Sequence, residues 1–134
     1  MKRVASITVI LCIVLSLCGC SGNVRDVKII GYTSEKYTDQ EIQDAIEVTK
    51  EYFAEVFDGC KLLELAYVGD DKLYEYVDFA ERVGSEDVIA FKSSFYVGFC
   101  GGDGSLETNE TYEGWDWILA KDENGNWVHV DHGY

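Results

Sequence analysis

The sequence has no proline and few basic residues. Its 134 residues hold 11 Lys plus Arg against 25 Asp plus Glu, which gives a formal net charge of −14. Phosphate backbones are bound by clustered Lys and Arg, so this shortage excludes a nucleic-acid partner. It also argues against electrostatic attachment to an anionic membrane surface. The absence of proline excludes a proline-rich stalk or linker.

The chain also lacks an apolar run long enough to cross a bilayer. The clearest run, residues 4–17, is uncharged and follows a positive Met1-Lys2-Arg3 head. A spanning helix needs about 20 apolar residues, whereas this shorter run is typical of a signal peptide. Over the whole chain, 47% hydrophobic and 13% aromatic residues are too many for a disordered protein, and the length fits one domain.

The apolar run ends in Leu17-Cys18-Gly19-Cys20. This segment resembles the lipobox of bacterial lipoproteins, which has an aliphatic residue, two small residues and an obligatory Cys. The resemblance implies cleavage before Cys20 and a diacylglyceryl group on its thiol, detectable as palmitate. Cys18 is unusual in such a box, but Gly19 directly before Cys20 favours modification of Cys20. An uncleaved amino-terminal helix is the alternative.

The lipobox divides the chain into three expected parts. Residues 1–19 are the signal peptide, residues 20–37 the lipidated Cys with a short tether and loop, and residues 38–134 a single domain. Processing removes two of the 11 basic residues and no acidic one, which deepens the charge from −14 to −16. The resemblance therefore implies an acidic domain on the extracytoplasmic face of a bacterial cell membrane, held by lipid alone.

Two cysteines remain in the mature chain, Cys60 and Cys100. An extracytoplasmic compartment can be oxidising, so they are a disulfide candidate, with two buried thiols as the alternative. A lone pair without a nearby His does not match a zinc motif.

Hydrophobic periodicity predicts the elements of the domain. Thr38 and Glu41 have capping-box spacing ahead of a helical stripe, Gly59 is placed to end that helix, and Asn124-Gly125 predicts a hairpin turn. In chain order we expect an edge strand, a helix, a strand, a helix and three strands, at residues 27–30, 38–58, 62–68, 72–83, 88–99, 111–121 and 127–131.

The predicted fold class is α+β, with two helices gathered on one face of a curved antiparallel sheet of about four strands, in the order helix-strand-helix-strand-strand-strand. This order resembles the cone-shaped cystatin-like and nuclear-transport-factor-like folds. The chain also resembles a group of small uncharacterised bacterial lipoproteins in its Gly101–Ser105 loop, its Trp115–Leu119 segment and its Trp127–Tyr134 end. That resemblance implies a fold but no established activity.

The best candidate for catalysis is on the last strand. His129 and Asp131 alternate with Trp127, so all three are expected on one side of the strand. An imidazole beside a carboxylate can serve as an acid–base pair or a weak metal site. The chain has only two His residues and no recognisable nucleophile motif, so a structural role for His129 is the alternative.

A second candidate is the glycine-rich loop at residues 101–105. Asp103, Glu107 and Asn109 offer the oxygen ligands that calcium prefers, although their spacing does not match an EF-hand. No strand–loop–helix order supports phosphate binding there. A plain connecting loop is the alternative.

Aromatic residues are the third feature. Trp115, Trp117 and Trp127 are expected either to fill the core or to line a ligand pocket. We therefore expect a lipid-anchored binding module without catalysis or cofactor, acting on a protein, peptide or sugar partner. The alternatives are a small cone-fold hydrolase or isomerase that uses His129 and Asp131, and a purely structural surface domain.

Overall fold

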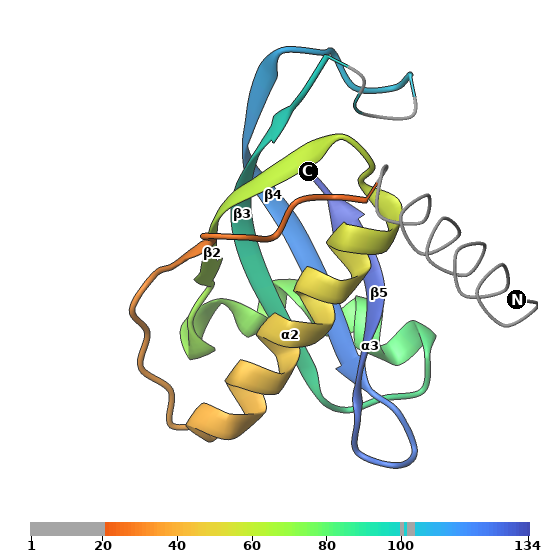
Figure 1. Ribbon diagram of the computed structural model, residues 1–134. Helices are drawn as coiled ribbons and strands as arrows, with labels where there is room; N and C mark the ends of the chain where they lie inside the picture. Colours follow the sequence, from red (N-terminus) through yellow and green to blue (C-terminus); the bar gives the residue numbers. More distant parts are fainter. Residues whose placement is uncertain (1–20, 100, 102–103) are drawn as a thin grey trace, which may run out of the picture.

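The computed structural model describes residues 21–99, 101 and 104–134. Its fold is α+β, with two α-helices and a five-stranded mixed sheet (Figure 1). The expected signal peptide, Cys20, Cys100 and Asp103 lie outside the described residues. The elements in chain order are β1 (Lys28–Ile29), α2 (Asp39–Val56), β2 (Cys60–Tyr67), the 3-10 helix η1 (Asp70–Tyr76), α3 (Val77–Arg82), β3 (Val88–Val97), β4 (Glu110–Lys121) and β5 (Trp127–Gly133).

Helix α2 begins with the predicted capping box. The Thr38 hydroxyl accepts a hydrogen bond from the Glu41 backbone N–H at 3.1 Å, and the Glu41 carboxylate accepts one from the Thr38 N–H at 2.8 Å. Both bonds satisfy donors that the first turn of a helix leaves unpaired. Most of the predicted helical stripe is buried, at Ile42, Ala45, Ile46, Thr49 and Phe53, whereas Tyr52 is partly buried and Val56, at the end of the helix, is exposed.

The sheet is open, in the order β1-β2-β3-β4-β5, with β1 and β5 at its edges. Strand β1 runs parallel to β2, and the other neighbours are antiparallel. The expectation of about four antiparallel strands is therefore corrected to five strands in a mixed sheet, within the predicted class. Strand β3 ends at Val97, two residues before the end of the predicted strand, and Phe99 is 82% exposed.

The additional strand is β1, which lies in the segment predicted as an edge strand at residues 27–30 and pairs with β2. The chain before β1 also lies against the domain. Gly22 N–H donates to the Ala54 carbonyl at 2.9 Å, and Asn23 forms a parallel bridge with Lys61. A Cβ added to Gly22 would lie 2.4 Å from the Phe53 carbonyl oxygen, so glycine is required for the chain to pass α2 this closely. The residues expected as a free tether therefore lie against the domain.

The two helices cover opposite faces of the sheet, which corrects the expectation that both lie on one face. Figure 1 shows α2 in front of the sheet, with η1 and α3 behind it. The start of β3 explains this arrangement, because Val88, Ile89, Ala90 and Phe91 are all buried although their side chains alternate between the two faces. Both faces of β3 are apolar there, and each needs a cover.

The second predicted helix is divided. Residues 70–76 form the 3-10 helix η1 and only residues 77–82 are α-helical. Asp70 accepts hydrogen bonds from the Ser34 and Tyr67 hydroxyls, each at 2.6 Å, and from the backbone N–H groups of Glu35 and Lys36. These bonds, led by the one from Ser34, lower the pKa of Asp70 to about 2. Asp70 thus ties the loop before α2 to the end of β2.

Candidate functional site

A β-bulge in β5 separates the predicted acid–base pair. His129 lies opposite Leu119 and Asp131 lies opposite Ile118, so Val130 is an extra residue in this strand. Leu119 and Ile118 are consecutive in β4 and face opposite sides of the sheet. The expectation that His129 and Asp131 share one side of the strand is therefore wrong. His129 faces α2, whereas Asp131 faces α3.

The bulge brings the two histidines of the chain together on the α2 face. His129 Nε2 lies 3.0 Å from His132 Nδ1, a hydrogen-bond distance at which one ring donates and the other accepts. The His129 ring stacks on Tyr52 of α2, with ring centres 3.7 Å apart. His132 lies among the rings of Phe57, Trp115 and Trp117. The pair is therefore half-buried beside aromatic side chains.

This environment favours the neutral form of both rings. Burial lowers the pKa of His129 to about 4, with a further lowering by the charge of His132 and an opposing effect from Asp131. Burial also lowers the pKa of His132. Asp131 does not orient either imidazole by a side-chain bond. Its Oδ1 accepts the His132 backbone N–H at 2.8 Å. The two histidine rings are therefore hydrogen-bonded to each other, in surroundings that disfavour their charged forms.

Two of the three candidate tryptophans belong to the core. Trp117 is fully buried and its Nε1–H donates to Ser93 Oγ at 2.7 Å. Trp127 is buried and donates to the Glu41 carbonyl at 2.9 Å. Trp115 is half-buried, and its enclosed Nε1 has no hydrogen-bond acceptor among the described residues. Trp117 and Trp127 thus have satisfied polar groups and no open ring face.

Of the calcium candidates that the structure describes, Asn109 is hydrogen-bonded through its side chain, whereas Glu107 is hydrogen-bonded through its backbone and is exposed. The Asn109 side-chain oxygen accepts a hydrogen bond from the Tyr96 hydroxyl at 3.0 Å, and the Glu107 backbone N–H donates to Tyr112. Gly101 packs against the chain at Gly59, where an added Cβ would lie 2.6 Å from the carbonyl oxygen. This close approach explains why residue 101 is a glycine, without invoking a bound ligand. Within residues 21–99, 101 and 104–134, no three His, Cys, Asp or Glu side chains form a metal-binding group.

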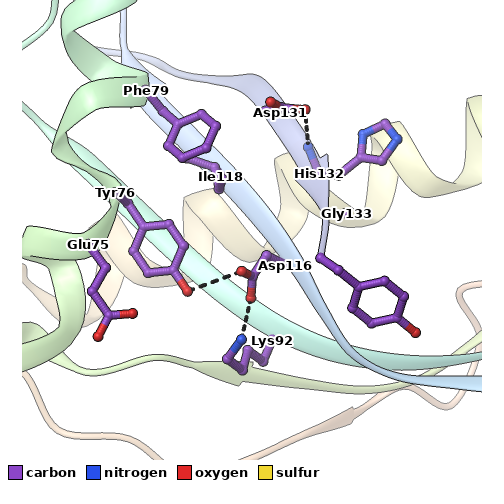
Figure 2. Close-up of a pocket in the computed structure, with 10 residues that line it drawn as sticks. Glu75, Tyr76, Phe79, Lys92, Asp116, Ile118, Asp131, His132 and Gly133 are labelled. Carbon is purple, nitrogen blue, oxygen red and sulfur yellow. Dashed lines mark hydrogen bonds and ion pairs between the residues drawn. The ribbon is translucent and has the colours of Figure 1, made fainter.

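The other face of the sheet carries a pocket of about 300 Å³, which we call the α3 pocket (Figure 2). Its wall on the helical side comes from η1 and α3, and its floor from β3, β4 and β5. Figure 2 shows Tyr76 and Phe79 over the strands, with the His132 ring turned away toward α2. The pocket is lined by Glu75, Tyr76, Phe79, Lys92, Asp116, Ile118, Asp131, His132, Gly133 and Tyr134.

An ion pair lies at the floor of the α3 pocket. Lys92 Nζ is 2.6 Å from Asp116 Oδ1, and the Tyr76 hydroxyl donates to Asp116 Oδ2 at 3.3 Å. The hydrogen bond to Asp116 raises the pKa of Lys92, and burial raises the pKa of Tyr76. The Asp116 side chain is 17% exposed and that of Lys92 54% exposed. The carboxylate is therefore fixed in the floor while the ammonium reaches the opening.

This pocket has only a weak signal in the sequence. Lys92 and Asp116 each interrupt an apolar stretch of their strand, and the β3–β4 register places them directly opposite each other. Oppositely charged cross-strand neighbours are a recognisable pattern once the register is known. Tyr76 has the spacing of an ordinary buried helical stripe and no sequence pattern singles out Phe79, so their place in a pocket wall could not be predicted.

Comparisons with protein-family models, with curated proteins and with solved structures gave no match to this chain. In the part of the chain that the structure describes, no helix has the length and apolarity to cross a membrane.

Proposed function

We propose that this chain is a lipid-anchored binding module on the extracytoplasmic face of a bacterial membrane, and that it binds a protein, peptide or sugar partner at the α3 pocket without catalysis. The α3 pocket carries the proposal. It combines the aromatic side chains of Tyr76, Phe79 and Tyr134 with four charged side chains, and such convergent polar groups can orient and select a ligand. The two histidines support a non-catalytic role, because each ring engages the other within an aromatic cluster on the opposite face of the sheet.

The anchor is tested by Cys20→Ser in the full-length chain. We expect the wild-type protein to incorporate labelled palmitate and to sediment with membranes. The variant should lose the label and leave the membrane fraction. Cys18→Ser is the matched control and should behave as wild type. Palmitate retained by Cys20→Ser would contradict the proposed anchor.

Binding at the pocket is tested with the full-length ¹⁵N-labelled chain in zwitterionic detergent micelles. Three probes are titrated: a basic tripeptide, its neutral analogue and a neutral oligosaccharide. A binding module predicts that at least one probe shifts the amide signals of Phe79 and Gly133 in a saturable way. The amide of Glu47, on the exposed side of α2, is the internal control. A structural domain predicts no shift with any probe.

A further inference from the structure

The α3 pocket has the composition of a site for a cationic side chain. Three carboxylates line it, those of Glu75, Asp116 and Asp131, against the single ammonium of Lys92. Its aromatic residues are Tyr76, Phe79 and Tyr134. We propose that the α3 pocket binds an arginine or lysine side chain from a basic segment of a partner protein. This inference rests on the proposed function and names the chemistry of its partner.

The charges of the lining differ in how far they are already neutralised. Asp116 is paired with Lys92, and Glu75 lies 3.8 Å from Lys72 at the rim. No Lys or Arg of the described residues forms an ion pair with Asp131. One oxygen of Asp131 accepts the His132 N–H, which leaves its second oxygen for a donor from a ligand. Asp131 is therefore the expected partner of the incoming charge.

The aromatic residues suit the rest of such a side chain. Long basic side chains lay their methylene stems along apolar surface and keep the charged end near water or a counter-ion. The Phe79 ring already holds a cation, because the Arg82 guanidinium lies 4.6 Å from its centre. Tyr134 is 81% exposed and packs edge-on against Trp115, with ring centres 5.1 Å apart. Tyr134 is thus an exposed residue of the pocket lining.

The size of the pocket also limits what enters it. About 300 Å³ lies at the lower end of the range for small-ligand sites, which fits one long side chain rather than a large cofactor. The net charge of the chain, −14, favours the approach of a basic partner and disfavours that of an acidic one.

Two peptides test whether the charge of the side chain is needed for binding. They are acetyl-Gly-Arg-Gly-amide and the same peptide with citrulline in place of arginine. Citrulline keeps the shape of the side chain and removes its charge. In the ¹⁵N titration described above, we expect the arginine peptide to shift the Phe79 and Gly133 amides and to bind at least tenfold more tightly than the citrulline peptide. Raising the salt concentration should weaken the binding of the arginine peptide and leave that of the citrulline peptide unchanged.

Asp131→Asn should lower the affinity for the arginine peptide about threefold to tenfold, because the negative charge is lost. The amide oxygen of Asn can still accept the His132 N–H. Glu47→Gln removes one charge on the outer side of α2 and should leave the affinity unchanged. The amide spectrum of each variant reports whether it is folded. Tyr134→Ala, at an exposed rim position, gives a second variant that should weaken binding without disturbing the core.

The possible failures are distinguishable. Equal affinity for the arginine and citrulline peptides, or binding of the oligosaccharide alone, would contradict the proposal that the pocket binds a cationic side chain. Either result would leave the proposed binding function in place. An equal loss of affinity in Asp131→Asn and Glu47→Gln would overturn the role of the pocket in binding the charge. The absence of any shift at the pocket amides with all probes would overturn both proposals.

Discussion

The two faces of the sheet are covered in different ways. On one face, the 18-residue helix α2 packs along the strands, and the rings of Phe53, Phe57, Phe95 and Trp117 contact one another. On the other face, η1 and the six-residue α3 cover a smaller area and leave the α3 pocket open. A long amphipathic helix can fill a face with side chains, whereas a short one leaves part of the sheet in contact with solvent.

The polar groups follow the same division. On the α2 face, Ser93 and Trp117 form a neutral buried hydrogen bond. On the α3 face, Lys92 and Asp116 form an ion pair beside an open pocket. Charges are tolerated where water or a ligand can reach them, and an enclosed core selects neutral partners. The α2 face thus stabilises the fold, and the thinner α3 face carries the pocket that we propose for binding.

The largest expected effect is on stability, when one aromatic residue from each face is replaced by alanine. Trp117→Ala removes a fully buried side chain and should cost about 3–5 kcal/mol of unfolding free energy. Phe79→Ala, in the half-buried wall of the α3 pocket, should cost about 1 kcal/mol because less apolar surface is lost. Urea unfolding of both variants measures the difference. Equal losses would break the proposed contrast between a filled face and an open one.

A pH titration tests the histidine pair of the α2 face. The folded state lowers the pKa of His129 to about 4 from 6.5, so the unfolded chain binds more protons between these values. Stability should therefore rise with pH across this window and be lost as pH falls from about 6.5 to 4. Since the ring is only half-buried, we expect a loss of about 1–2 kcal/mol.

His129→Gln is the matched variant for this titration, because glutamine does not titrate. Its urea midpoint should depend less on pH between 6.5 and 4.5 than that of the wild type. The response of Asp70, whose pKa is lowered to about 2, begins at about pH 5 and falls mainly below this range, so it contributes little to the comparison. If the urea midpoint of the variant changed with pH as steeply as that of the wild type, the pH dependence could not be assigned to His129.

The smallest expected effect compares the starts of the two helices. Thr38→Ala removes the capping box of α2 and should cost about 1 kcal/mol. Helix α3 has no side-chain cap at Tyr76, so Asp78→Ala in its first turn should change stability by less than about 0.5 kcal/mol. Urea midpoints measure both changes. A larger loss from Asp78→Ala would mean that α3 contributes more to folding than its length implies.

Prediction from the sequence succeeded where the signal is local. The capping box at Thr38, the stripe of α2 and the Asn124-Gly125 turn depend on residues only a few positions apart, and Gly125 has the positive φ of 79° that this turn favours. Prediction failed at β5. Strict alternation placed His129 with Asp131, but Val130 bulges out because of how the strand pairs with β4, and pairing is not encoded in the strand alone.

The sequence by itself determined that this protein is an acidic α+β domain with a capped amphipathic helix and a terminal hairpin, because charge, periodicity and turn chemistry are properties of short stretches of chain. Only the tertiary structure decided which face each helix covers, that the two histidines meet, and that Lys92, Asp116 and Asp131 line one pocket with Tyr76 and Phe79. These features arise from strand register and from contacts between residues far apart in the chain, which bring side chains together without a local pattern.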